Sequence, residues 1–118
     1  MKAVTIWHNP RCGKSRQTLA LLRAKGIEPA VREYLKQPPS KAEIEKLMGL
    51  LDGDTTELIR DGEPQFKKLG KKKSELGKAD IAAAIARHPI LLQRPVVVVA
   101  GERAAIGRPP EAVLPLLK

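Results

Sequence analysis

The segment His8-Asn9-Pro10-Arg11-Cys12-Gly13-Lys14-Ser15-Arg16 holds the only cysteine of the chain and separates two different sequence patterns. Before it, residues 2–7 (Lys-Ala-Val-Thr-Ile-Trp) predict a short strand. After it, residues 14–25 carry leucines and a threonine at helical spacing and predict a helix. The Asn-Pro pair favours an extended turn between the two elements. Cys12 is therefore expected at the N-terminal cap of this helix.

The surroundings of Cys12 favour the thiolate form of its side chain. The backbone N–H groups of a helix N-terminus, the positive end of the helix dipole and the cations of Arg11, Lys14 and Arg16 all stabilise negative charge. Cysteines in such settings have pKa values of about 3.5 to 7.5, against about 8.5 for a free thiol. The alternative is a buried structural cysteine, but the adjoining Pro, Arg, Gly and Lys are not core residues. The pattern indicates a reactive thiol beside an anion site.

A second predicted strand completes a βαβ unit, and predicted helices follow it. Residues 29–35 predict a second strand, and the βαβ order implies that it pairs in parallel with the first. Ser40 and Glu43 form a capping box for a helix whose inward face is Ile44, Leu47, Met48 and Leu51. Asp54 with Glu57 predicts a second acidic cap and a short helix that ends near Arg60. Residues 66–78 are basic and predicted to be irregular, and residues 79–87 predict another helix.

The C-terminal part of the chain predicts a hairpin and a last helix. Residues 96–100 and 103–106 are expected to be antiparallel strands joined by a two-residue Gly101-Glu102 turn. Pro109 and Pro110 suit the first turn of a final helix. The order βαβ, helices, ββα predicts an α/β fold with a thioredoxin-like mixed sheet and a helical insertion. We expect one domain over residues 1–118, with the thioredoxin-like core at about 1–37 and 89–118 and the insert at about 38–88.

The charge, the cysteine and histidine content and the hydropathy of the chain limit which partners and which cellular compartment are expected. The net charge is +9 with a sequence pI of about 10.0, which favours anionic partners without specifying one. One cysteine and two histidines that are distant in sequence make a poor metal site, so none is expected. The N-terminus does not resemble a signal peptide and no apolar run is long enough to span a membrane, which indicates the cytoplasm. The basic cluster at 67–73 lacks interleaved aromatics, and we interpret it as a solvated loop rather than a nucleic-acid site.

Four segments together closely resemble the glutaredoxin-coupled arsenate reductases of the ArsC family, and in particular its short, chromosomally encoded members. They are His8-Asn9-Pro10-Arg11-Cys12, Arg60 within Leu-Ile-Arg, His88-Pro89-Ile90-Leu91-Leu92-Gln93-Arg94-Pro95, and Gly107-Arg108-Pro109. They occur in the family's order and spacing, and the resemblance spans nearly the whole chain.

The resemblance implies a role for each site residue. Cys12 would attack arsenate, while Arg60, Arg94 and Arg108 would hold the oxyanion, and Pro95 would be the cis-proline opposite the cysteine. His8 would interact with Cys12 and tune it, and the alternative for this residue is an edge-strand histidine with no role. For Ser15 two interpretations remain open, a local hydrogen bond in the first helical turn and a hydrogen bond to the thiolate.

The resemblance also implies the reductants. An external thiol would reduce the arsenic(V) adduct and leave a mixed disulfide between glutathione and Cys12, which glutaredoxin resolves. Glutathione is then a co-substrate, glutaredoxin a partner, and no tightly bound cofactor is needed. The residue types fit this chemistry, because the planar fork of arginine donates to two oxyanion oxygens at once. Arg11 and Arg16 are alternative ligands.

Other thiol functions remain as alternatives. A redox regulator like the Spx proteins, which bind RNA polymerase, shares the fold, but its Cys-x-x-Cys switch would need a cysteine where Ser15 stands. A glutathione-dependent thiol transferase would use Cys12 without the arginines. The phosphatase-type arsenate reductases place an arginine six residues after the cysteine, where this chain has Thr18.

Overall fold

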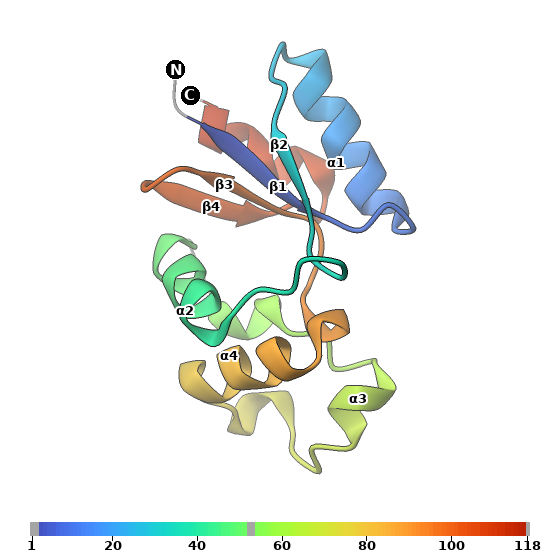
Figure 1. The fold of residues 1–118 in the computed structure, drawn as a ribbon, viewed down its shortest axis with the longest axis vertical. Helices are drawn as coiled ribbons and strands as arrows, with labels where there is room; N and C mark the ends of the chain where they lie inside the picture. Colours follow the sequence, from blue (N-terminus) through green and yellow to red (C-terminus); the bar gives the residue numbers. More distant parts are fainter. Residues whose placement is uncertain (1–2, 52–53, 118) are drawn as a thin grey trace.

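A four-stranded mixed sheet forms the centre of the molecule (Figure 1). The computed structural model describes residues 3–51 and 54–117. Within these, the strands lie in the order β2-β1-β3-β4, with β1 parallel to β2 and the other two pairs antiparallel. Their bounds are β1 Val4–His8, β2 Ala30–Glu33, β3 Val96–Val99 and β4 Arg103–Ile106. This is the predicted thioredoxin-like arrangement; Lys2 of the first predicted strand lies outside the described residues.

Two helices cover one face of the sheet. The 12-residue α1 (Gly13–Ala24) connects β1 to β2, and η4 (Pro110–Leu117), a 3₁₀-helix, packs beside it. Figure 1 shows η4 behind β1 and β2, and α1 beside β2. Their apolar residues enclose a small core with side chains from β1 and β3 that point to this face: Ile6, Leu22, Val97, Val99, Val113 and Leu116.

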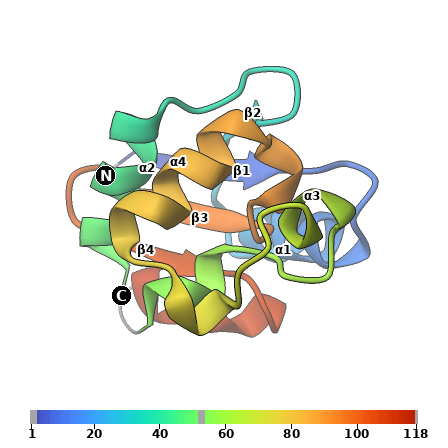
Figure 2. The same ribbon diagram turned by 90° about the horizontal axis from the view of Figure 1, so that it is seen from below.

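The segment between β2 and β3 is helical and covers the opposite face (Figures 1 and 2). It comprises α2 (Lys41–Leu50), η1 (Thr55–Leu58), α3 (Pro64–Lys67), η2 (Lys73–Glu75), α4 (Lys78–Arg87) and η3 (Pro89–Leu91). The main contact within it is between α2 and α4. Its apolar side chains form the larger core together with Trp7 of β1 and Val96 of β3. Trp7 and Val96 adjoin Ile6 and Val97 in sequence and therefore point to the opposite face of the sheet. No helix of residues 3–51 and 54–117 is long and apolar enough to span a membrane.

Several local predictions are confirmed, and others are wrong in detail. The capping box is present, since Ser40 and Glu43 each accept the other's backbone N–H. Ile44, Leu47 and Met48 are buried as predicted, whereas Leu51 lies past the end of α2 and is only half-buried. The strand hairpin exists, but Val99 pairs with Arg103. Its turn therefore has three residues, Ala100 to Glu102, and Gly101 takes a φ of +71°.

The remaining differences have local causes. The final helix is a 3₁₀-helix, because in an α-helix the ring of Pro115 would clash with the carbonyl of Glu111. The Asp54 side chain does cap, but it accepts from Thr56 N–H. The helix it starts ends at Leu58, because Ile59 is extended and pairs with Leu92. Residues 66–78 are not wholly irregular: they include part of α3, η2 and the start of α4.

Candidate active site

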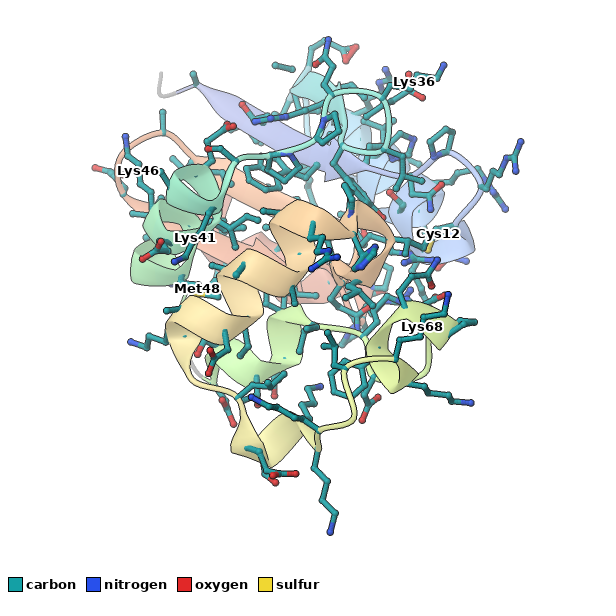
Figure 3. All side chains as sticks on the ribbon, turned by 60° about the horizontal axis from the view of Figure 1, so that its bottom comes forward. Cys12, Lys36, Lys41, Lys46, Met48 and Lys68 are labelled. Carbon is teal, nitrogen blue, oxygen red and sulfur yellow. The ribbon has the colours of Figure 1, made fainter. Side chains whose placement is uncertain are left out.

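Cys12 lies where β1 leaves the sheet and α1 begins. It is the N-cap residue of α1, with extended backbone, and its N–H donates to the Asn9 carbonyl at 3.0 Å. Figure 3 shows its sulfur at the N-terminal end of this helix. The side chain is half-buried and makes no capping hydrogen bond, and the first turn of α1 contains no acidic residue. The N–H groups of this turn are thus directed at the sulfur without competition from a carboxylate.

The surroundings of Cys12 lower the pKa of its thiol. Burial acts in the opposite direction and raises the pKa, but several groups together outweigh it. They are the backbone N–H groups of Ser15 and Lys14, the positive charge of Arg108, and a side-chain hydrogen bond from Arg94. The helix terminus and the arginines therefore favour the thiolate, the nucleophilic form.

The side chains of His8 and Ser15 are hydrogen-bonded to each other. His8 Nδ1 lies 2.6 Å from Ser15 Oγ, and the same oxygen accepts the Asn9 N–H at 3.1 Å. All three residues are buried. Burial lowers the pKa of His8, which Glu33 opposes and Arg16 and Arg23 reinforce, so the imidazole is neutral near pH 7. The Ser15 hydroxyl thus makes the local hydrogen bonds and its backbone N–H points to Cys12. His8 is linked to the cysteine through Ser15.

A short backbone bridge brings Arg60 to the site. Ile59 pairs antiparallel with Leu92, with Arg60 N–H donating to the Leu91 carbonyl at 2.8 Å. The Arg60 side chain then donates to Gln93 Oε1 at 3.0 Å and to Glu63 Oε1 at 3.2 Å. The extended conformation of Ile59, which the sequence did not indicate, is therefore what places Arg60 beside the segment that carries Arg94.

Arg94 is the most enclosed of the three arginines, with 11% of its side chain exposed. Its Nη1 donates to the Ile90 carbonyl at 3.1 Å, and its Nη2 lies 3.9 Å from the Glu63 carboxylate that also pairs with Arg60. The Arg94–Pro95 peptide bond is cis. One carboxylate thus holds two guanidinium groups in place, and it stands at the start of α3.

Arg108 contacts the cysteine directly. Its Nη2 lies 3.3 Å from Cys12 Sγ, and its Nε donates to the Arg94 carbonyl at 2.7 Å. Gly107 allows this approach, because a Cβ there would lie 2.6 Å from Thr18 Oγ1 and 2.8 Å from Pro95 Cγ. The glycine also donates its N–H to the Pro95 carbonyl. The Gly-Arg-Pro segment is therefore packed directly onto the cis-proline and α1.

These side chains surround one cleft with a volume of about 510 Å³. Cys12, Arg60, Arg94 and Arg108 all line it, and Arg11 and Lys36 add positive charge near Glu33. Arg16 instead donates to the Pro10 carbonyl. Among the described residues, no group of three or more His, Cys, Asp or Glu could hold a metal ion. Fold and cleft together define a thioredoxin-like thiol protein whose single cysteine faces a basic cleft lined by arginines.

Comparison with known proteins shows the family. The ArsC family profile matches residues 7–116. An arsenate reductase of Haemophilus influenzae is 40% identical over 98% of this chain and 99% of its own length, and one of Rhizobium meliloti is 44% identical over 97% and 81%. The solved structure titled as the arsenate reductase of Vibrio cholerae has a TM-score of 0.87 and 43% identity, covering 97% of each chain. The chain belongs to the ArsC family.

Sequence reasoning did not identify Glu63, Gln93 and Asn9 as parts of the site. Glu63 pairs with two of the arginines, Arg60 and Arg94. Gln93 Oε1 accepts from both the Arg60 side chain and the Arg94 N–H. Asn9 Oδ1 accepts the Arg11 N–H and shapes the loop before Cys12. The available sequence signals were the position of Glu63, three residues after Arg60, and that of Gln93, directly before Arg94.

We expect the Cys12 thiol to titrate below the ordinary free-cysteine value of about 8.5. The rate of iodoacetamide alkylation against pH measures this pKa. Arg108→Ala should raise the midpoint, because it removes a cation at 3.3 Å from the sulfur. Arg87→Ala removes the same charge from an exposed position at the end of α4 and serves as the control. A wild-type midpoint at the ordinary value would contradict the helix-terminus and arginine effects.

Proposed function

We propose that this protein reduces arsenate to arsenite at Cys12. The observation that carries the proposal is the contact of Arg108 with the Cys12 sulfur in a cleft that Arg60 and Arg94 also line. Tetrahedral oxyanions need several converging donors, and three guanidinium forks supply them. The names of the relatives that match nearly the whole chain support arsenate as the anion.

The proposed reaction begins with attack of the Cys12 thiolate on arsenic. A sulfur–arsenic(V) bond forms, and a protonated arsenate oxygen leaves as water or hydroxide. The arginines neutralise the anion, which would otherwise repel the thiolate, and stabilise the charge that builds up on its oxygens. An external thiolate then attacks the Cys12 sulfur. The electron pair of the sulfur–arsenic bond passes to arsenic, arsenite leaves, and a mixed disulfide remains on Cys12.

The external thiol is proposed to be glutathione, with glutaredoxin resolving the mixed disulfide. Cys12 is the only cysteine, so the chain cannot form an internal disulfide. Electrons must therefore come from outside, and no tightly bound cofactor is required. A glutathione pool implies a reducing compartment, and we propose the cytoplasm. In this scheme His8 and Asn9 hold the Ser15 hydroxyl by hydrogen bonds, and the backbone N–H of Ser15 stabilises the thiolate. His8 and Asn9 are therefore positioning residues that do not touch the substrate.

The reductants are tested by leaving each one out of an arsenite assay. With arsenate, glutathione and glutaredoxin present, we expect continuous arsenite production by the purified protein. Without glutathione, production should stop. Without glutaredoxin, it should slow to the rate at which free glutathione attacks the mixed disulfide. Full activity with thioredoxin alone would contradict the proposed reductants, while leaving reduction at Cys12 in place.

A further inference from the structure

The hydroxyl of Tyr34 is buried without a hydrogen-bond partner. The residue has no exposed surface, and its ring packs in the larger core with Trp7. Within the described residues, Tyr34 Oη is one of three buried side-chain atoms that lack a partner. A phenylalanine would fill the same core without leaving a polar atom unsatisfied. Unpaired buried groups are costly and rare in folded proteins, so this hydroxyl needs an explanation other than folding.

The sheet register places Tyr34 in the active-site region. His8 pairs with Glu33 in the parallel ladder, so the next residues, Asn9 and Tyr34, are neighbours past the ends of β1 and β2. In the antiparallel ladder Trp7 pairs with Val96, and two further steps bring Asn9 opposite Arg94. Tyr34, Asn9 and Arg94 therefore form a row across the end of the sheet from which the Cys12 loop leaves.

A second unpartnered atom lies in the same row. Arg94 Nε is buried and also lacks a hydrogen-bond partner within the described part of the chain. Its Nη1 is meanwhile held by the carbonyls of Ile90 and Leu92, at 3.1 and 3.5 Å. The two unpaired groups are complementary, because an arginine Nε–H can only donate and a phenol oxygen can accept. Burial raises the pKa of Tyr34, whereas the charge of Arg94 and the neighbouring side chain of Asn9 lower it.

We propose that Tyr34 is a positioning residue for Arg94, whose Nε–H donates to the phenol oxygen when the terminal nitrogens of the guanidinium hold an oxyanion beside Cys12. The inference rests on the proposed function, since it assigns Tyr34 to the anion-bound form of that site. When the anion binds, Arg94 Nη1 exchanges the Ile90 and Leu92 carbonyls for anion oxygens. The hydrogen bond from Nε to Tyr34 then fixes the plane of the guanidinium group. The hydroxyl is thus retained for binding the anion and contributes nothing to the stability of the empty protein.

Tyr34→Phe tests this inference in protein that carries Cys12→Ser, so that arsenate binds without reacting. Titration calorimetry with arsenate should show an affinity about 10- to 100-fold weaker than in the Cys12→Ser parent, the loss of one hydrogen bond to a charged group. In a parent that also carries Arg94→Ala, Tyr34→Phe should cause no further loss, because the two residues act together. The melting temperature without arsenate should be unchanged or higher.

Thr18→Val is the matched control for stability. The Thr18 hydroxyl is equally buried but donates to the Lys14 carbonyl at 2.8 Å, so its removal should lower the melting temperature. Unchanged arsenate affinity in Tyr34→Phe would overturn the inference, as would an equal loss in the Arg94→Ala background. A lower melting temperature with unchanged affinity would assign the hydroxyl to folding. If the parent protein does not bind arsenate, the proposed function fails together with the inference.

Discussion

Arg94→Lys is expected to lower kcat/KM for arsenate by about 10- to 100-fold, although it keeps the positive charge. The Arg94 guanidinium lies almost fully enclosed between the Ile90 carbonyl and the Glu63 carboxylate, and it lines the cleft with Cys12. A lysine ammonium is a point charge and cannot donate in a planar fork to two anion oxygens. Arg94→Ala, which also removes the charge, should lose still more. Steady-state arsenite production measures both variants.

Arg87→Lys provides the control for this substitution. Arg87 is exposed at the end of α4 and is not among the residues that line the cleft, so its exchange should leave kcat/KM unchanged. Arg94→Lys with wild-type kinetics would remove Arg94 from the oxyanion site. A thiol transferase would behave differently, because exchange of a protein-bound glutathione at Cys12 does not need an oxyanion ligand. Survival of transferase activity in Arg94→Ala, without arsenate turnover in the wild type, would favour that alternative.

The order of elements and the position of Cys12 could be predicted from the sequence because both depend on local signals. The strand pattern before the cysteine and the helical pattern after it fix Cys12 at the cap of α1. The Ser40–Glu43 capping box is likewise local. Where two local signals compete, the prediction was wrong: Pro110 can open an α-helix, yet Pro115 five residues later keeps η4 a 3₁₀-helix.

The interactions that assemble the arginines could not be predicted, because they join segments distant in sequence. Ile59 has the apolar character of a helix residue, but its backbone pairs with Leu92. That pairing depends on how the helical segment packs against the sheet. Glu63 belongs to a turn-forming segment, and only the fold shows that its carboxylate faces Arg60 and Arg94. The family resemblance supplied the arginines, and the structure adds the acidic and amide groups that hold them.

Cys12→Ser is expected to lower arsenite production by about 1,000-fold or more, to the background of the assay. A serine hydroxyl is a far weaker nucleophile and cannot supply the electron pair that passes to arsenic when the mixed disulfide forms. The fold should be retained, since Cys12 is only half-buried and serine is a preferred N-cap residue. We therefore expect an equal or higher melting temperature and retained arsenate binding in this variant, which separates loss of chemistry from loss of structure.

The most direct test of reduction at Cys12 is arsenite formation from arsenate by the purified wild-type protein and Cys12→Ser, assayed side by side with glutathione and glutaredoxin. We predict sustained turnover by the wild type and none above background by the variant. Equal arsenite production by the two proteins would contradict the role of Cys12. Absence of arsenite from wild-type protein whose Cys12 alkylates as a thiolate would contradict arsenate as the substrate of this cleft.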